Sequence, residues 1–360
     1  MDRHIENQYT PDHVSHPGAT LIDVLNALGM SQAGLAERTG LTKKTINEIA
    51  KGKAALTPTT ALKLERVLGT PASFWNNRER HYREFLARAA EQEQLRESVA
   101  WLKSVPLRAM IRSKWIRRLE DPVQQMQEVL GFFGVASPQQ WRELWLAPAA
   151  SFRKSPSFQS EPGAVAAWLR KGEIDAQGIQ CANYDDGLFR RALDEIRGYT
   201  LMPPEEFSPK LIGRCAACGV AVVFVPELPR TRASGATRWL SGKAIVQVSL
   251  RYRTDDHLWF SFFHEAGHIL RHGRKDVFIE DGALNAKEEE ANEFARTTLI
   301  PDAQYRRFVD RKTFGTASCL RFAQTVGIAP GIVVGRLQHD HYLLYSQGNA
   351  LKRRLRWTSP

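Results

Sequence analysis

The most constraining feature of the sequence is the pentapeptide His-Glu-Ala-Gly-His at residues 264–268, which lies in a strongly apolar segment. In an α-helix, positions four apart share one face, so His264 and His268 can bind the same metal ion. Glu265 then lies beside that ion, where it can take a proton from an activated water. The apolar flanks predict a helix buried in a core. The alternative is a pair of hydrogen-bonded core histidines, but we favour a catalytic metal site.

A third ligand is expected downstream, because a catalytic zinc site usually has three protein ligands and one open position. The segment 287–299 is acidic at its start and carries an apolar stripe at helical spacing. Glu288 is the preferred ligand, since Asn292 follows one helical turn later and could orient one of the histidines. Glu289 and Glu290 remain alternatives. Two imidazoles and a carboxylate favour Zn²⁺ over manganese.

Residues 31–51 have the pattern of a helix-turn-helix, with an ordinary helical hairpin as the alternative. Ser31 and Thr42 are suited to cap two successive helices, and Gly40 between them can adopt the positive φ of a tight turn. The second helix would enter the major groove of DNA, where its polar side chains contact bases and phosphates. The candidate DNA-binding residues are Gln32, Thr42, Lys43, Lys44, Thr45, Asn47 and Lys51.

The sequence around the pentapeptide resembles the ImmA/IrrE metallopeptidases, which are gluzincin-like zinc peptidases. The resemblance runs from about Ser208 to Leu337. Besides Asp256–His268, it rests on Glu290–Ala295 and Leu299–Pro301, and it includes Ser234–Thr237, which is similar to that family's strand ahead of the active-site helix. It implies a zincin-like domain. Members of that family cleave or release repressors of stress genes and mobile elements.

Residues 16–85 resemble the HigA-type antitoxins of the Xre repressor class. The resemblance rests on His16-Pro17-Gly18, on Gly52-Lys53 and on the segment Leu68–Trp75 around the helix-turn-helix. It implies a homodimer that reads paired half-sites of a double-stranded DNA operator. It also implies a toxin as a candidate partner.

Length and composition agree with a multidomain globular protein. At 360 residues the chain can form two or three domains, and its net charge of +11 favours a nucleic acid as partner. No apolar stretch approaches the length of a membrane span, which predicts no membrane association. The first residues, Met1–His4, lack the form of a signal peptide, so we expect a cytoplasmic location.

The predicted fold class is mainly α with a small β-sheet (α+β). Strands are expected at 219–226 and 244–250, and amphipathic helices in the middle of the chain at 122–134, 138–146, 161–171 and 186–197. Later helices are expected at 302–311 and 317–338, with an interruption at 327–330. The predicted domains are an all-α helix-turn-helix domain at 1–77, a helical connector at 78–100, a helical middle domain at 101–207 and a zincin-like metallopeptidase domain at 208–360.

Three further residues of metal-binding types, two cysteines and a histidine, receive structural interpretations. Cys215 and Cys218 have the spacing of a zinc or redox pair, but no second pair completes a four-ligand site. We interpret them as core residues, and the alternative is a thiolate that masks the catalytic metal until it is oxidised. His272 lies one turn beyond His268 and is not expected to be a ligand.

The sequence therefore predicts a DNA-binding transcriptional regulator with a zinc-dependent endopeptidase domain. Its substrate would be a repressor bound at or near the same DNA, or the chain itself, because attachment to a DNA-reading domain raises the effective concentration there. One alternative is a transcription factor whose zinc domain is a non-catalytic sensor. The other is an antitoxin that binds a toxin through the middle domain.

Overall fold

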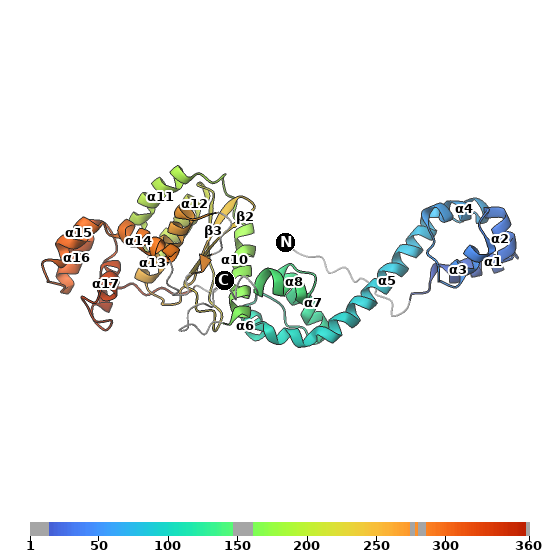
Figure 1. The fold of residues 1–360 in the computed structure, drawn as a ribbon, viewed down its shortest axis with the longest axis horizontal. Coiled ribbons are helices and arrows are strands. Elements are labelled where there is room, and N and C mark those ends of the chain that lie inside the picture. The colour runs from blue at the N-terminus through green and yellow to red at the C-terminus, as the bar shows by residue number, and fades with distance from the viewer. Residues whose placement is uncertain (1–13, 147–160, 274–277, 280–285, 358–360) are drawn as a thin grey trace. The chain divides into compact units, whose positions relative to one another are not determined.

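The computed structural model describes residues 14–146, 161–273, 278–279 and 286–357; Met1–His4, on which the expected location depends, lies outside them. The chain divides into two compact units, residues 1–99 and residues 100–360. Each is described by itself, and Figure 1 labels their elements.

The first unit is all-helical, as predicted. The structure confirms both predicted caps: Ser31 Oγ accepts a hydrogen bond from Gly34 N at 3.0 Å, and Thr42 Oγ1 accepts one from Thr45 N at 3.1 Å. Gly40 has a φ of 68° in the turn between the two helices. The helices are α1 (Pro17–Ala27), α2 (Gln32–Thr39), α3 (Lys43–Ala50), α4 (Pro58–Leu68) and α5 (Ala72–Ser98), and their buried side chains form one hydrophobic core.

The long helix predicted at 78–100 begins earlier, at residue 72, as α5. Its first turn belongs to the core of the first unit, where Trp75 is fully buried. The carboxylate of Glu65 accepts a hydrogen bond from the backbone N of Ala72 at 2.5 Å and so caps the helix. This contact spans two helices, so local sequence pattern did not reveal it.

The second unit begins with short helical elements that confirm the predicted helices of the middle segment. The large aromatic residues form its core: Trp101 and Trp141 are buried edge to face, with ring centroids 5.4 Å apart. The elements are η1 (Val99–Ser104), α6 (Leu107–Arg112), α7 (Pro122–Phe133), α8 (Pro138–Trp141), η2 (Arg142–Leu146), α10 (Pro162–Gln177), α11 (Asp186–Tyr199) and α12 (Pro204–Ala216).

A four-stranded sheet lies at the centre of this unit, in the order β1-β3-β2-β4. Both predicted strands are confirmed, as β1 (Val220–Phe224) and β3 (Lys243–Val248), which run parallel to each other. The strand implied by the family resemblance is β2 (Gly235–Leu240), and β4 (Phe278–Ile279) was not predicted. β4 is only two residues long and exists through its antiparallel pairing with β2.

Helices cover both faces of this sheet (Figure 1). Side chains alternate along β1, so that Val222 faces the core shared with α11, α12 and α13 (Asp255–Arg271), whereas Val223 faces α10. Trp168 of α10 is fully buried, and its indole nitrogen donates to the carbonyl of Val225 at 3.0 Å. The predicted boundary between residues 207 and 208 therefore does not separate two cores. The reason is that both faces of the sheet are buried, and the helices that cover them come from before and after this boundary in the chain.

Burial also accounts for the cysteine pair. Cys215 and Cys218 are both fully buried in the core beside the sheet. Burial raises the pKa of the Cys215 thiol well above its usual range. These surroundings favour neutral thiols that pack as small core residues.

The C-terminal part of the unit is helical, and the predicted break near residue 327 is confirmed. Within the described residues no single helix is long and apolar enough to cross a membrane. Only α16 (Thr316–Val326) and α17 (Pro330–His339) taken together have that length and apolar composition, and they are bent by 112° at their junction. The elements are α13 (Asp255–Arg271), α14 (Ala286–Leu299), α15 (Asp302–Val309), α16 (Thr316–Val326), α17 (Pro330–His339) and η4 (Asn349–Leu351).

The segment after η4 is tied to the start of α13 through two buried carboxylates. Lys352 Nζ lies 2.6 Å from Asp256 Oδ2, and both side chains are less than a tenth exposed. Asp255 Oδ1 accepts a hydrogen bond from the backbone N of Arg353 at 3.0 Å. Burial and the neighbouring Asp256 raise the pKa of Asp255 to about 6. This contact fixes the beginning of the helix that carries the pentapeptide.

We predict that Lys352→Ala lowers the free energy of unfolding by about 3 kcal/mol, because it leaves the Asp256 carboxylate buried without its cation. Urea denaturation followed by circular dichroism measures the change. Arg356→Ala removes an exposed cation from the same segment and should leave stability unchanged. An equal loss in both variants would contradict a specific role for the buried ion pair.

Candidate metal centre

The pentapeptide lies on α13, which is buried on all sides along its centre. Every residue from Ser261 to Ile269 is buried. Gly267 faces α14, where an added Cβ would lie 3.2 Å from Cα of Ala291 and 3.1 Å from the ring of Phe294. The glycine therefore permits a close crossing of the two helices. That crossing brings the acidic start of α14 to the histidines of α13.

Three side chains converge at this crossing. His264 Nε2 and His268 Nε2 lie 3.0 Å apart. Glu288 Oε2 lies 3.1 Å from His264 Nε2, and Glu288 Oε1 lies 3.4 Å from His268 Nε2. All three residues are buried. Ligands of a tetrahedral zinc ion at its usual bond lengths are about 3.3 Å apart, so this donor set fits zinc.

The structure separates the three candidate glutamates. Glu288 is buried and belongs to the convergent group. The side chains of Glu289 and Glu290 are 57% and 55% exposed, and they contact Arg296 and His272 respectively. Among the alternatives left open by the sequence, Glu288 alone has the position of a third ligand.

The pKa shifts of Glu288 and His268 suit a divalent cation. Burial raises the pKa of Glu288, but hydrogen bonds with His264 and His268 outweigh it and bring the pKa down to about 2. Burial lowers the pKa of His268. An ionised carboxylate and neutral imidazoles are the forms that bind a metal.

Both histidines are oriented through their second ring nitrogen. Asn292 Oδ1 lies 3.0 Å from His264 Nδ1, as the spacing from Glu288 predicted. His268 Nδ1 lies 3.0 Å from His272 Nδ1, and the ring of Phe278 stacks on His268 at 4.1 Å. His272 Nε2 in turn lies 3.2 Å from a carboxylate oxygen of Glu290. The role of His272 as a positioning residue was missed, although its spacing of four from His268 was a usable signal.

Contacts with β2 hold the side chain of Glu265. Its side chain is fully buried, and Thr237 Oγ1 lies 2.6 Å from its Oε2. Gly235 lies directly against the carboxylate, since an added Cβ would be 2.4 Å from Glu265 Oε1. The resemblance placed both residues in a strand but assigned them no role. A carboxylate fixed beside a metal-binding group is placed to move a proton.

In the first unit all the candidate DNA-binding residues except Gln32 lie on α3 or at its two ends. Lys43, Lys44 and Asn47 are exposed on the helix, and Lys51 is exposed at its C-terminal end. The hydroxyls of Thr42 and Thr45 lie 2.9 Å apart in the N-terminal cap, and Gln32 is half-buried at the start of α2. The predicted set thus divides into exposed residues that can reach DNA and residues that shape the helix start.

Comparisons with known proteins match a different family model in each of the two units. Residues 21–75 match the family model of the helix-turn-helix, and residues 236–337 match the model of the IrrE N-terminal-like domain, a peptidase family. No curated protein matches the chain.

Two solved structures resemble a part of the chain. One is a candidate antidote protein of a plasmid maintenance system from Nostoc punctiforme, with 27% identity over 24% of this chain and 94% of its own, and a TM-score of 0.23. The other is an addiction module antidote protein of the HigA family from Coxiella burnetii, with 28% identity over 23% of this chain and 91% of its own, and a TM-score of 0.22.

The chain therefore combines an Xre-type helix-turn-helix domain with an IrrE-like domain of the metallopeptidase type. Peptidases of this type are typically zinc-dependent, which agrees with the buried group of two histidines and a glutamate.

We predict that Glu288→Gln weakens zinc binding by more than about a hundredfold. Removing a residue that only hydrogen-bonds to a metal ligand already lowers the metal affinity by up to about a hundredfold, and Glu288 is proposed to be a ligand itself. Competition with a chromophoric chelator measures the affinity. Glu293→Gln is the matched control, because this acid of the same helix pairs with Arg296 and not with the residues around the histidines, and it should bind zinc as the wild type does. Comparable losses in both variants would disprove the assignment.

Proposed function

We propose that the chain is a DNA-binding regulator whose second unit is a zinc-dependent endopeptidase. The observation that carries this proposal is the convergence of His264, His268 and Glu288 next to a separately held carboxylate, Glu265. A purely structural metal site has no use for such a base. Catalytic sites, in contrast, pair an open metal position with a group that moves protons.

In the proposed mechanism, zinc held by the two histidines and Glu288 supplies Lewis acidity to a water molecule and to the scissile carbonyl. Glu265 accepts the proton of the attacking water and later donates it to the leaving amine. Thr237 and Gly235 keep its carboxylate in place through a short hydrogen bond and a close backbone approach. Asn292 and His272 keep the two imidazole rings in their ligand orientation.

The substrate that fits this organisation is a protein bound at or near the same DNA, a repressor, or a second copy of the chain. Joining a peptidase to a DNA-reading domain raises its concentration close to DNA-bound proteins, so modest intrinsic activity suffices. The expected setting is a stress or mobile-element response. We further propose that the chain binds its operator as a homodimer, and the HigA resemblance keeps a toxin as a second candidate partner.

We predict that Glu265→Gln keeps zinc but lowers the rate of cleavage about a hundred- to ten-thousandfold, because proton transfer is lost while the ligands stay. Gly235→Ala should have the same signature, since its methyl group displaces the carboxylate. The zinc content is measured on each purified variant. Cleavage is measured in cells, on the proteins that crosslink to DNA. The matched control is Gly213→Ala, at an exposed glycine of α12 that has open space around its Cα and no positive φ.

Two results would contradict the endopeptidase. Undiminished cleavage by Glu265→Gln would eliminate the mechanism. A wild-type protein that holds zinc and occupies its operator yet cleaves nothing would favour the non-catalytic sensor.

The DNA-binding proposal predicts different effects for two residues of α3. With a duplex that the wild-type protein selects from a random pool, Asn47→Ala should cost about 1–3 kcal/mol and relax the choice of one base. Lys43→Ala should weaken binding to all duplexes alike and reduce the salt dependence by about one charge. Fluorescence anisotropy over a salt series measures both. Arg66→Ala, an exposed cation on α4, is the control, and an equal effect there would contradict the assignment to α3.

A further inference from the structure

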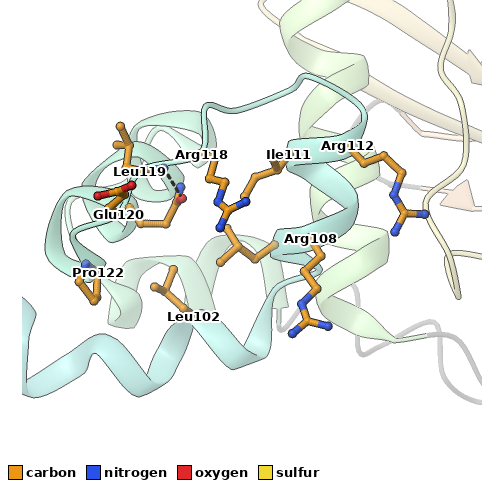
Figure 2. Close-up of a pocket in the computed structure, with 10 residues that line it drawn as sticks. Leu102, Arg108, Ile111, Arg112, Arg118, Leu119, Glu120 and Pro122 are labelled. Atoms are coloured by element: carbon orange, nitrogen blue, oxygen red, sulfur yellow. Dashed lines mark hydrogen bonds between the residues drawn. The ribbon is translucent and has the colours of Figure 1, made fainter.

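The second unit contains a cavity of about 540 Å³ that the proposed function does not use. It lies among η1, α6, the loop before α7 and the start of α7 (Figure 2). Its apolar surface comes from Leu102, Leu107, Ile111, Leu119 and Pro122. None of its lining residues belongs to the group around His264. The cavity is therefore a separate, partly open hollow where a small molecule can bind.

The charge around the cavity is strongly one-sided. Three arginines line it, Arg108, Arg112 and Arg118, against a single acid, Glu120. The sequence from 101 to 118 holds six cations and no acidic residue. Within the described part of the chain, the guanidinium group of none of the three lining arginines has an ion pair or hydrogen bond with another described residue. Unpaired guanidinium groups beside an apolar wall are suited to a ligand that is itself part anionic and part apolar.

Hydrogen bonds hold the backbone on both sides of Arg118. Gln125 is buried, and its side-chain amide donates to the carbonyl of Arg117 at 3.1 Å and accepts from the backbone N of Leu119 at 2.9 Å. Arg117 is itself fixed by an ion pair with Glu128 at 2.8 Å. These contacts fix the backbone on both sides of Arg118. A pre-formed loop lowers the entropic cost of binding a ligand there.

Figure 2 shows that the three arginines, all of them exposed, point in different directions around the cavity. The side chain of Arg118 points toward Ile111, into the space between α6 and the loop before α7. Arg108 and Arg112 extend from α6 on the side away from Glu120. An anionic group at Arg118 would thus leave its apolar part against Leu102 and Ile111.

We propose that this cavity binds a small anionic amphiphile, a molecule with an apolar chain and one carboxylate or phosphate group. The apolar chain packs against the aliphatic side chains of η1 and α6. The anionic group pairs with Arg118, and Arg108 adds to the positive potential at the rim. This inference does not depend on peptidase activity.

Isothermal titration of the full-length protein with decanoate, decyl phosphate and decanol tests the proposal. One of the two anions should bind saturably at one site per chain, and its identity tells carboxylate from phosphate as the preferred group. Decanol has the same chain without the charge and should bind at least about tenfold more weakly, as expected for the loss of a charge-assisted pair.

Variants locate the site and control for folding. Arg118→Gln should weaken binding of the anion at least about tenfold. Ile111→Glu should abolish it by placing a negative charge in the apolar wall. Lys103→Gln removes a cation from the same segment that does not line the cavity, so it should bind as the wild type does. Unchanged far-ultraviolet circular dichroism confirms that each variant is folded.

Three outcomes would overturn the proposal. In the first, no anion binds saturably. In the second, decanol binds as tightly as decanoate, which would make the cavity a non-specific apolar hollow. In the third, Arg118→Gln lowers affinity for duplex DNA while the amphiphiles do not bind, which would assign the cations to nucleic acid.

Discussion

The proposed chemistry depends on the close crossing of α13 and α14. His264 and His268 share one helix, but an acid from another helix completes the group only because the backbones approach closely at Gly267. The same approach allows Asn292 to reach His264. A larger side chain at the crossing would push α14 outward and withdraw the ligand and its neighbour together. The metal-binding geometry is therefore a consequence of helix packing as much as of ligand identity.

The sheet and its two helical layers hold this crossing in place. β2 supplies Thr237 and Gly235, which position the carboxylate of Glu265, and the pairing of β4 with β2 carries Phe278, whose ring stacks on His268. Residues that orient the ligands thus come from strands as well as helices. The reacting groups are thus held by side chains from several rigid elements and not by local structure alone.

The first unit depends less on contacts between distant segments. Ser31 and Thr42 cap two of its helices, and the side chains proposed to contact DNA need only be exposed on α3. All of this is encoded within about twenty consecutive residues, which is why the sequence alone predicted it. The early start of α5 depends on Glu65 from α4, a contact that no local pattern shows.

The sequence by itself determined most of the helices, the strands β1 and β3, the placement of His264 and His268 on one helix face, and the class of both family-matched domains. These features follow from spacing within one element. Only the tertiary structure brought Glu288, and not Glu289 or Glu290, to the two histidines, gave His272 a partner, and placed α10 and α12 on the same sheet. The reason is that the three successive glutamates are the same type of residue but point in different directions from the helix. Which direction faces the site is set by helix crossings between segments that are distant in the chain.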